Sequence, residues 1–165
     1  MEIGRFLRHV AMSPLKARRI FPDKTMDAIA AEIGASEKRH RGEIVFVVEA
    51  ELTTEQLWRG LGSRERALEV FASQGAWNTE ENNGVLVYVL LADRSVEVVA
   101  DRGIDRHVGA EAWRAIVEAI DGHFRAGRFE EGALAGVRAV SAHLERHFPE
   151  QGEGRNQLGD RPIRM

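Results

Sequence analysis

The sequence predicts one α/β domain built as a three-layer α/β/α sandwich, with a small mixed sheet that includes a central β-hairpin. First, the uninterrupted apolar run from Val85 to Leu91 is typical of a strand buried on both faces. Second, Ile44 to Val48 is another such run. Third, segments with helical spacing of apolar residues precede, separate and follow the two runs. This order of elements favours helices on both faces of the sheet.

Composition agrees with a single domain and excludes several classes of protein. The chain has 165 residues, of which 44% are hydrophobic, enough for an ordinary core. A net charge of −3 and the lack of any nucleic-acid-binding motif argue against a nucleic-acid partner. The chain has no cysteine, which excludes disulfides, thiolate metal sites and a cysteine nucleophile.

Residues 1–20 form a basic amphipathic arm in which Ile3, Phe6, Leu7 and Val10 follow helical spacing. The favoured interpretation is a short helix packed on its own domain, because the apolar face is only about three turns long. The alternative is peripheral contact with an anionic membrane through residues 1–12. Because the sequence shows neither a signal peptide nor a stretch of ~20 apolar residues, we expect a soluble, cytoplasmic protein.

The main domain is expected to cover residues 21–148. A helix opens at Phe21-Pro22-Asp23 and precedes the strand at 44–48. A further helix, with Ser63 as its N-cap, joins this strand to the strand at 85–91, as in the crossover of a parallel βαβ unit. Residues 75–84 form a polar loop that leads into the second strand.

The second strand turns at Ala92-Asp93-Arg94-Ser95 and returns as an alternating strand at 96–100, giving the hairpin. We expect a loop from Ile104 to Gly109. Apolar stripes then predict helices at about 110–126 and 129–147. Residues 149–165 form a polar tail that we expect to be mobile.

Polar residues gather at both ends of the hairpin and include candidate ligands for a hard cation. Asp93 lies near the carboxyl end of the first strand, where Glu49 and Glu51 follow. At the other end, Asn82 and Asn83 precede the second strand. The end of the third strand should bring Asp101 beside them. The alternative is turn chemistry, in which such side chains stabilise their own backbone.

Other candidates give weaker signals. Arg94 and Arg102 could hold a phosphate by paired hydrogen bonds, although such arginines more often form surface ion pairs. His143 and His147 have the spacing of a helical metal pair but lack the glutamate of the zinc-protease motif. His107 follows Asp101 and Asp105 and could exchange protons. The serine elbow, the phosphate-binding glycine loop and the dinucleotide fingerprint are all missing, so no organic cofactor is expected.

The combined motifs resemble the TPM domain family, named after a thylakoid-lumen acid phosphatase, a photosystem repair protein and a nematode receptor auxiliary protein. The resemblance covers about residues 22–148. It rests on Trp77, Asn82-Asn83-Gly84-Val85-Leu86-Val87, Asp93-Arg94 with Val96-Glu97-Val98, Asp101-Arg102-Gly103-Ile104, and Phe124-Arg125-Ala126-Gly127-Arg128-Phe129-Glu130-Glu131-Gly132.

The resemblance implies an α/β/α sandwich and an acidic cleft that binds calcium in some members. Carried over onto this sequence, it implies a Ca²⁺ or Mg²⁺ site at Asp93, with Asn82, Asn83 and Asp101. The chain departs from the family after the third strand, where Ala100-Asp101-Arg102-Gly103 replaces the usual glycine-aromatic-glycine. We therefore expect a cation-binding accessory module for a protein partner, with little or no catalysis. The alternative is a metal-assisted acid phosphatase in which Arg94 or Arg102 holds the phosphate.

Overall fold

The centre of the molecule is a four-stranded open sheet with the order β3-β2-β1-β4. A computed structural model describes residues 2–150, 152 and 158–165. The strands are β1 (Glu43–Glu49), β2 (Gly84–Leu90), β3 (Ser95–Ala100) and β4 (Ile163–Arg164). β1 pairs in parallel with β2 and with β4, whereas β2 and β3 form the antiparallel hairpin. The sheet is therefore mixed and has the hairpin that the sequence predicts.

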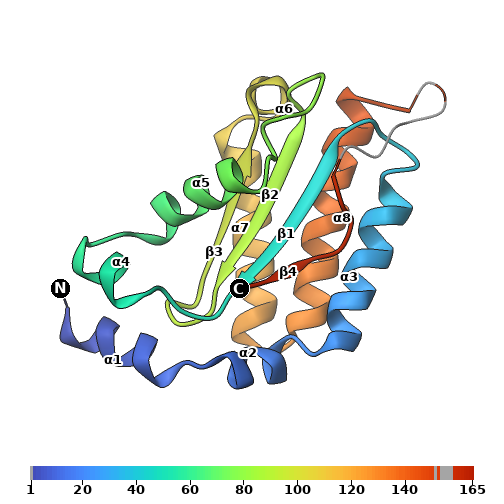
Figure 1. Cartoon of the computed structure of the whole chain (residues 1–165). Helices are drawn as coiled ribbons and strands as arrows, with labels where there is room; N and C mark the ends of the chain where they lie inside the picture. The colour runs from blue at the N-terminus through green and yellow to red at the C-terminus, as the bar shows by residue number, and fades with distance from the viewer. Residues whose placement is uncertain (1, 151, 153–157) are drawn as a thin grey trace.

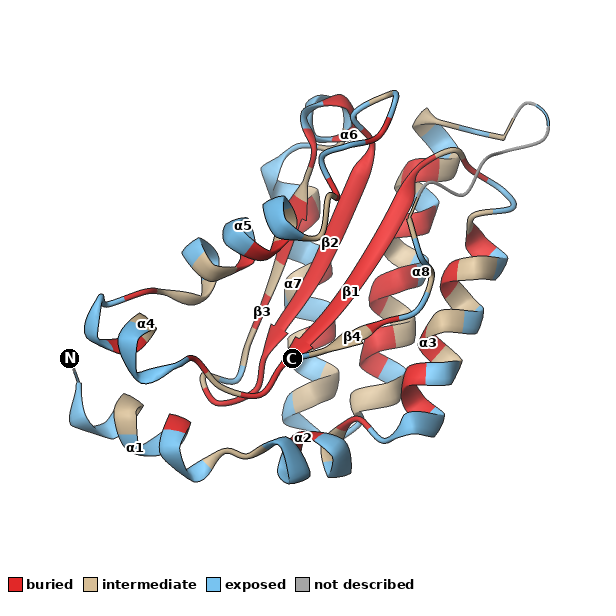
Figure 2. Ribbon diagram, viewed as in Figure 1, coloured by how far each residue is buried: buried red, intermediate tan, exposed pale blue. Residues whose placement is uncertain are grey.

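The two central strands are buried along their whole length (Figure 2). Their continuous apolar runs suit this position, because both faces of the sheet are covered and neither face needs polar side chains. β3 lies at the edge, where Ser95 and Glu97 are partly exposed and alternate with the buried Val96 and Val98.

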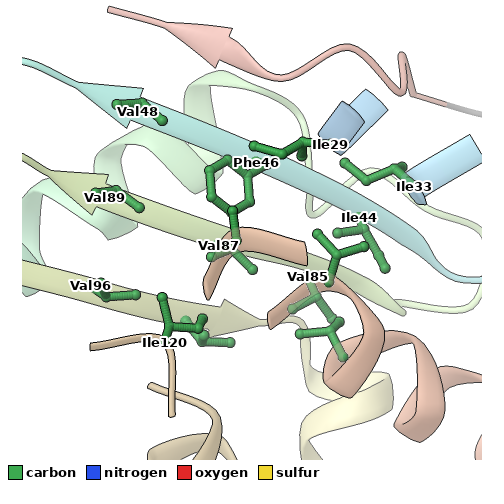
Figure 3. Close-up of a cluster of buried hydrophobic side chains, with 14 of the residues drawn as sticks. Ile29, Ile33, Ile44, Phe46, Val48, Val85, Val87, Val89, Val96 and Ile120 are labelled. Carbon is green, nitrogen blue, oxygen red and sulfur yellow. The ribbon is translucent and has the colours of Figure 1, made fainter. Parts of the chain in front are cut away.

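Three helices cover one face of the sheet and form the larger core. They are α3 (Asp23–Ser36), α7 (Ala110–Arg125) and α8 (Phe129–His147). Ile29 and Ile33 from α3 and Ile120 from α7 pack against side chains of β1 and β2 (Figure 3). The apolar faces of these helices thus pack against the side chains that β1 and β2 direct to this side of the sheet, as the sequence predicts.

The opposite face is covered by α5 (Ser63–Ser73), with α4 (Thr54–Trp58) beside it (Figure 1). Ala67 and Val70 of α5 join Val47 and Tyr88 in a second, smaller core. Helices on both faces give the three-layer sandwich that the sequence predicts. α4 begins with a capping box, in which Thr53 and Gln56 satisfy each other's backbone donors.

The amino-terminal arm forms two short helices, α1 (Ile3–Ala11) and α2 (Pro14–Ile20), which run along one edge of the molecule (Figure 1). The favoured interpretation expects a helix packed on its own domain, and α1 does lie against the domain, but not through its apolar face. Ile3, Leu7 and Val10 are exposed, and of the four apolar residues only Phe6 packs against the smaller core. The helix is attached through its polar side instead.

Two short elements were not expected from the sequence. Most of the segment predicted as a loop at 104–109 belongs to a helix, α6 (Arg102–Val108), which Asp101 caps and after which Gly109 follows. The segment predicted as a mobile tail ends in β4, whose pairing with Val47 and Val48 extends the sheet. The rest of that prediction concerns residues 151 and 153–157, which lie outside the described residues. No helix in the described part of the chain is long and apolar enough to cross a membrane.

Candidate functional site at the two ends of the hairpin

The hairpin divides the candidate cation ligands between its two ends. Asp93 lies in the turn between β2 and β3, whereas Asn82 and Asn83 precede β2 and Asp101 follows β3. The predicted neighbourhood of Asp101 and the two asparagines is confirmed by a backbone hydrogen bond from Asp101 to Gly84. Seven residues of β2 separate the two ends, or about 20 Å at ~3.4 Å per residue. Asp93 therefore does not share a site with the other three.

The carboxylate of Asp93 is held by α1. Arg5 donates to it from Nε, at 3.1 Å to Oδ1 and 3.0 Å to Oδ2, and from Nη2 at 2.7 Å to Oδ2. His9 Nε2 lies 3.0 Å from Oδ1. Burial alone would raise the pKa of Asp93, but the hydrogen bonds from Arg5 and His9 outweigh it and hold the pKa below its usual value. We call Arg5, His9 and Asp93 the Asp93 clasp.

His9 also connects α1 to the loop after β1. Its Nδ1 accepts a hydrogen bond of 2.9 Å from the backbone N–H of Leu52, which assigns the ring proton to Nε2, facing Asp93. Arg5 adds a bond of 2.7 Å to the carbonyl of Leu61. Neither Arg5 nor His9 is predicted from the sequence as a partner of Asp93. Their helical spacing could have indicated a shared polar face, because Arg5 and His9 lie on the side of α1 opposite Ile3 and Leu7.

Glu49, a predicted neighbour of Asp93, is engaged by other residues. Arg66 binds both of its carboxylate oxygens at 2.9 to 3.2 Å, and the Tyr88 hydroxyl donates to Oε2. Burial and the hydrogen bond to Glu49 raise the pKa of Tyr88, so the phenol stays protonated. This buried trio ties α5 to the sheet and leaves Glu49 little capacity for a cation.

At the other end of the hairpin, Asp101 and Asn83 each present an unsatisfied oxygen. Asp101 Oδ1 accepts a 2.7 Å bond from the backbone N–H of Arg102. Asn83 donates from Nδ2 to the carbonyl of Arg41 at 3.1 Å. In the described part of the structure, Asp101 Oδ2 and Asn83 Oδ1 are buried without a hydrogen-bond partner. The residues are only 8% and 1% exposed.

The backbone here is closely packed. At Gly103 in α6, a Cβ atom would lie 2.2 Å from the carbonyl oxygen of Glu81 and 2.4 Å from that of Asn82. Only glycine allows this approach. The Asn82 carbonyl accepts the N–H of Ile104 at 3.2 Å. Residues 100–103, where the chain departs from the family pattern, therefore include the start of α6. The first turn of this helix packs against the backbone of Glu81 and Asn82.

The remaining candidates lie in more open positions. Asn82 is exposed and has a positive φ of 52°, a conformation in which asparagine is well tolerated. Arg94, in the hairpin turn, is exposed with a φ of 53°. Arg102 is exposed beside Asp101. Arg94 and Arg102 lie at opposite ends of the hairpin, so only Arg102 accompanies the unsatisfied oxygens.

The three histidines considered as candidates pack against aromatic rings. His107 stacks on His147 with ring centroids 5.0 Å apart, and His143 packs on Trp113 at 5.7 Å. Asp105 accepts a bond from the Trp113 indole rather than orienting His107. Within the residues that the structure describes, no group of three or more histidine or acidic side chains is placed to hold a metal ion. A cation site would therefore need amide or backbone oxygens.

Comparison with known families decides the affiliation of the chain. The model of the TPM domain matches residues 16–143. The chain belongs to the TPM domain family. The matched range contains β2 and α7 entirely and most of α8. These elements carry the motifs of the resemblance.

Solved structures share the fold of this TPM domain. The NMR structure of the BA42 protein from the psychrophilic bacterium Bizionia argentinensis is 27% identical, with a TM-score of 0.76, and the match covers 86% of this chain and 93% of that one. The N-terminal domain of a P. gingivalis protein is 23% identical, with a TM-score of 0.54, covering 74% and 76%. The second likeness concerns the fold alone. No curated protein matches the chain.

Proposed function

We propose that this TPM domain is a divalent-cation-binding accessory module that acts on a protein partner and has little or no catalytic activity. The observation that carries the proposal is the pair of buried, unsatisfied oxygens, Asp101 Oδ2 and Asn83 Oδ1. A buried carboxylate oxygen without a partner is costly, and a bound cation would remove that cost.

The chemistry of these donors suits calcium better than a transition metal. Ca²⁺ takes carboxylate, amide and backbone carbonyl oxygens in flexible arrangements, and water completes its shell. Asp101 would supply the charge and Asn83 a neutral oxygen. Asp93, which the resemblance put first, is already held by Arg5 and His9. We therefore assign the site to the Asn83–Asp101 end of the hairpin.

The test is calorimetric titration of the chelator-treated protein with Ca²⁺ and with Mg²⁺. Asp101→Asn keeps a residue that caps helices well while removing the charge, so we expect calcium affinity to fall at least about tenfold without loss of the fold. Asp93→Asn is the matched control, the same change at the other end of the hairpin, and should bind like the wild type.

Two outcomes would contradict the proposal. If the wild type bound neither ion, the module would not be a cation-binding one. If Asp93→Asn lost binding and Asp101→Asn kept it, the site would lie at the hairpin turn instead.

A metal-assisted acid phosphatase is the second candidate, favoured by the exposed Arg102 beside Asp101. A cation at Asp101 would polarise a phosphoryl oxygen while Arg102 held the phosphate. In that case hydrolysis of a generic phosphate ester should depend on calcium or magnesium and should be lost in both Asp101→Asn and Arg102→Gln. Calcium binding without any turnover would leave the accessory module as the function.

A further inference from the structure

The orientation of α1 is the reverse of the usual one for an amphipathic helix on a protein surface. Surface helices normally turn their apolar stripe toward the core. Here the Asp93 clasp and the Arg5 bond to the Leu61 carbonyl fix the polar side of α1 against the domain. The apolar side therefore faces outward because polar contacts hold it there.

Large apolar side chains are concentrated on this outward side. Ile3, Leu7 and Val10 are 76%, 58% and 65% exposed, and Leu15 at the start of α2 is 73% exposed. Ile3, Leu7 and Val10 have the i, i+4, i+7 spacing of one helix face. Figure 2 shows α1 and α2 as mostly exposed helices along one margin of the molecule. A clustered apolar surface of this kind marks an interaction site.

The charge of the arm indicates which kind of partner binds its apolar surface. The exposed basic residues of α1 and α2 are Arg8, Lys16, Arg18 and Arg19. The only acidic residue in residues 2–20 is Glu2, although the chain as a whole carries a net charge of −3. Exposed cations beside apolar side chains on a helix are typical of segments that lie at an anionic membrane surface.

We propose that α1 and the start of α2 dock the domain on an anionic lipid bilayer. Ile3, Leu7, Val10 and Leu15 enter the boundary between headgroups and acyl chains, while the basic side chains contact lipid phosphates and carboxylates. A second copy of the chain fits this surface less well, because it would bring the same basic segment against itself. The inference is independent of the proposed cation site.

The test uses the full chain and vesicles of two compositions, phosphatidylcholine alone and phosphatidylcholine with a minority of phosphatidylserine. In flotation assays at low salt, we expect binding to the anionic vesicles, little binding to the neutral ones, and loss of binding as the salt concentration rises. The double variant Leu7→Gln/Val10→Gln should lower the partition coefficient at least about tenfold, because binding scales with the apolar area that enters the bilayer.

The chain offers a matched control for each kind of contact. Leu68 on α5 is 48% exposed, so Leu68→Gln removes a similar apolar surface elsewhere and should bind like the wild type. Lys16→Gln/Arg19→Gln should weaken binding to anionic vesicles, whereas Lys38→Gln, an exposed lysine beyond α3, should not. All of these side chains are exposed, so unchanged thermal unfolding should accompany each substitution.

Three results would overturn the proposal. The wild type could fail to float with anionic vesicles. The Leu7→Gln/Val10→Gln variant could float as well as the wild type. Finally, sedimentation could show a concentration-dependent dimer that the same variant abolishes, without vesicle binding, in which case a second copy covers this surface.

Discussion

Glu37 carries a proton that few glutamates retain at neutral pH. Burial, the nearby carboxylate of Glu43 and a hydrogen bond with Asp160 raise its pKa to about 9, although the backbone N–H of Ile44 opposes this. The folded state therefore holds the proton more tightly than the unfolded chain does. This small cluster joins the end of α3 to β1 and to the carboxyl-terminal segment.

The sign of the resulting pH dependence follows from proton linkage. Because the pKa of Glu37 is higher in the folded state, its contribution is fully present below the unfolded value near 4.5 and is lost as pH rises toward 9. We expect the free energy of unfolding to fall across this window. Glu37→Gln should flatten the slope in urea titrations between pH 6 and about 9. An unchanged slope in the variant would show that another group titrates.

At the scale of elements, α1 is secured by a few polar contacts rather than by a large apolar interface. His9 is 2% exposed and satisfies both the Leu52 N–H and Asp93. Removing its ring leaves one buried donor unpaired and loosens one side of the clasp. Such losses cost about 1–3 kcal/mol each.

We therefore expect His9→Ala to free the arm before it unfolds the sheet. Limited proteolysis should cut within residues 1–20 much faster than in the wild type, with a stability loss of about 2 kcal/mol. Arg8→Ala is the control, since Arg8 is exposed and its Nη2 lies 3.9 Å from Asp93 Oδ1. The effect of this substitution should stay within about 0.5 kcal/mol. Equal cleavage of both variants would mean that other contacts secure α1.

The sequence predicted the long elements well and the short ones poorly. β1 was expected at 44–48 and spans Glu43–Glu49, and α8 has the predicted bounds, because their patterns are long and regular. α6 and β4 offered too few residues for a period to show, although Asp101 is a recognisable N-cap.

The candidate sites were predictable only in part, because contacts distant in sequence leave no local signal. The approach of Asp101 to Asn83 followed from strand direction. The clasp did not, since His9 and Arg5 lie 84 and 88 positions from Asp93. The side of α1 that contacts the domain was not predicted, for the same reason. An apolar stripe predicts which residues share one side of a helix. It does not predict whether polar residues distant in sequence will bind the opposite side and so turn the apolar side toward solvent.

For the whole molecule, the two ends of the hairpin should behave as energetically separate regions. Changes at positions more than about 10 Å apart without shared partners usually add within ~0.5 kcal/mol, and β2 separates Asp93 from Asp101 by more than that. In calcium-free buffer, the stability losses of Asp93→Asn and Asp101→Asn should sum to that of the double variant. A larger interaction energy in this double-mutant cycle would indicate strain transmitted along β2.

The length of β2 therefore has a consequence for design. A rigid strand fixes the spacing between the arm and the Asn83–Asp101 end while insulating each from substitutions at the other. At the proposed cation site, Asn83 and Asp101 are the positions to vary for ion preference. Gly103 must be kept, because a Cβ there would clash with the Glu81 and Asn82 carbonyls. The arm can be exchanged without altering this proposed site. The hairpin acts as a spacer that lets the two surfaces diverge independently.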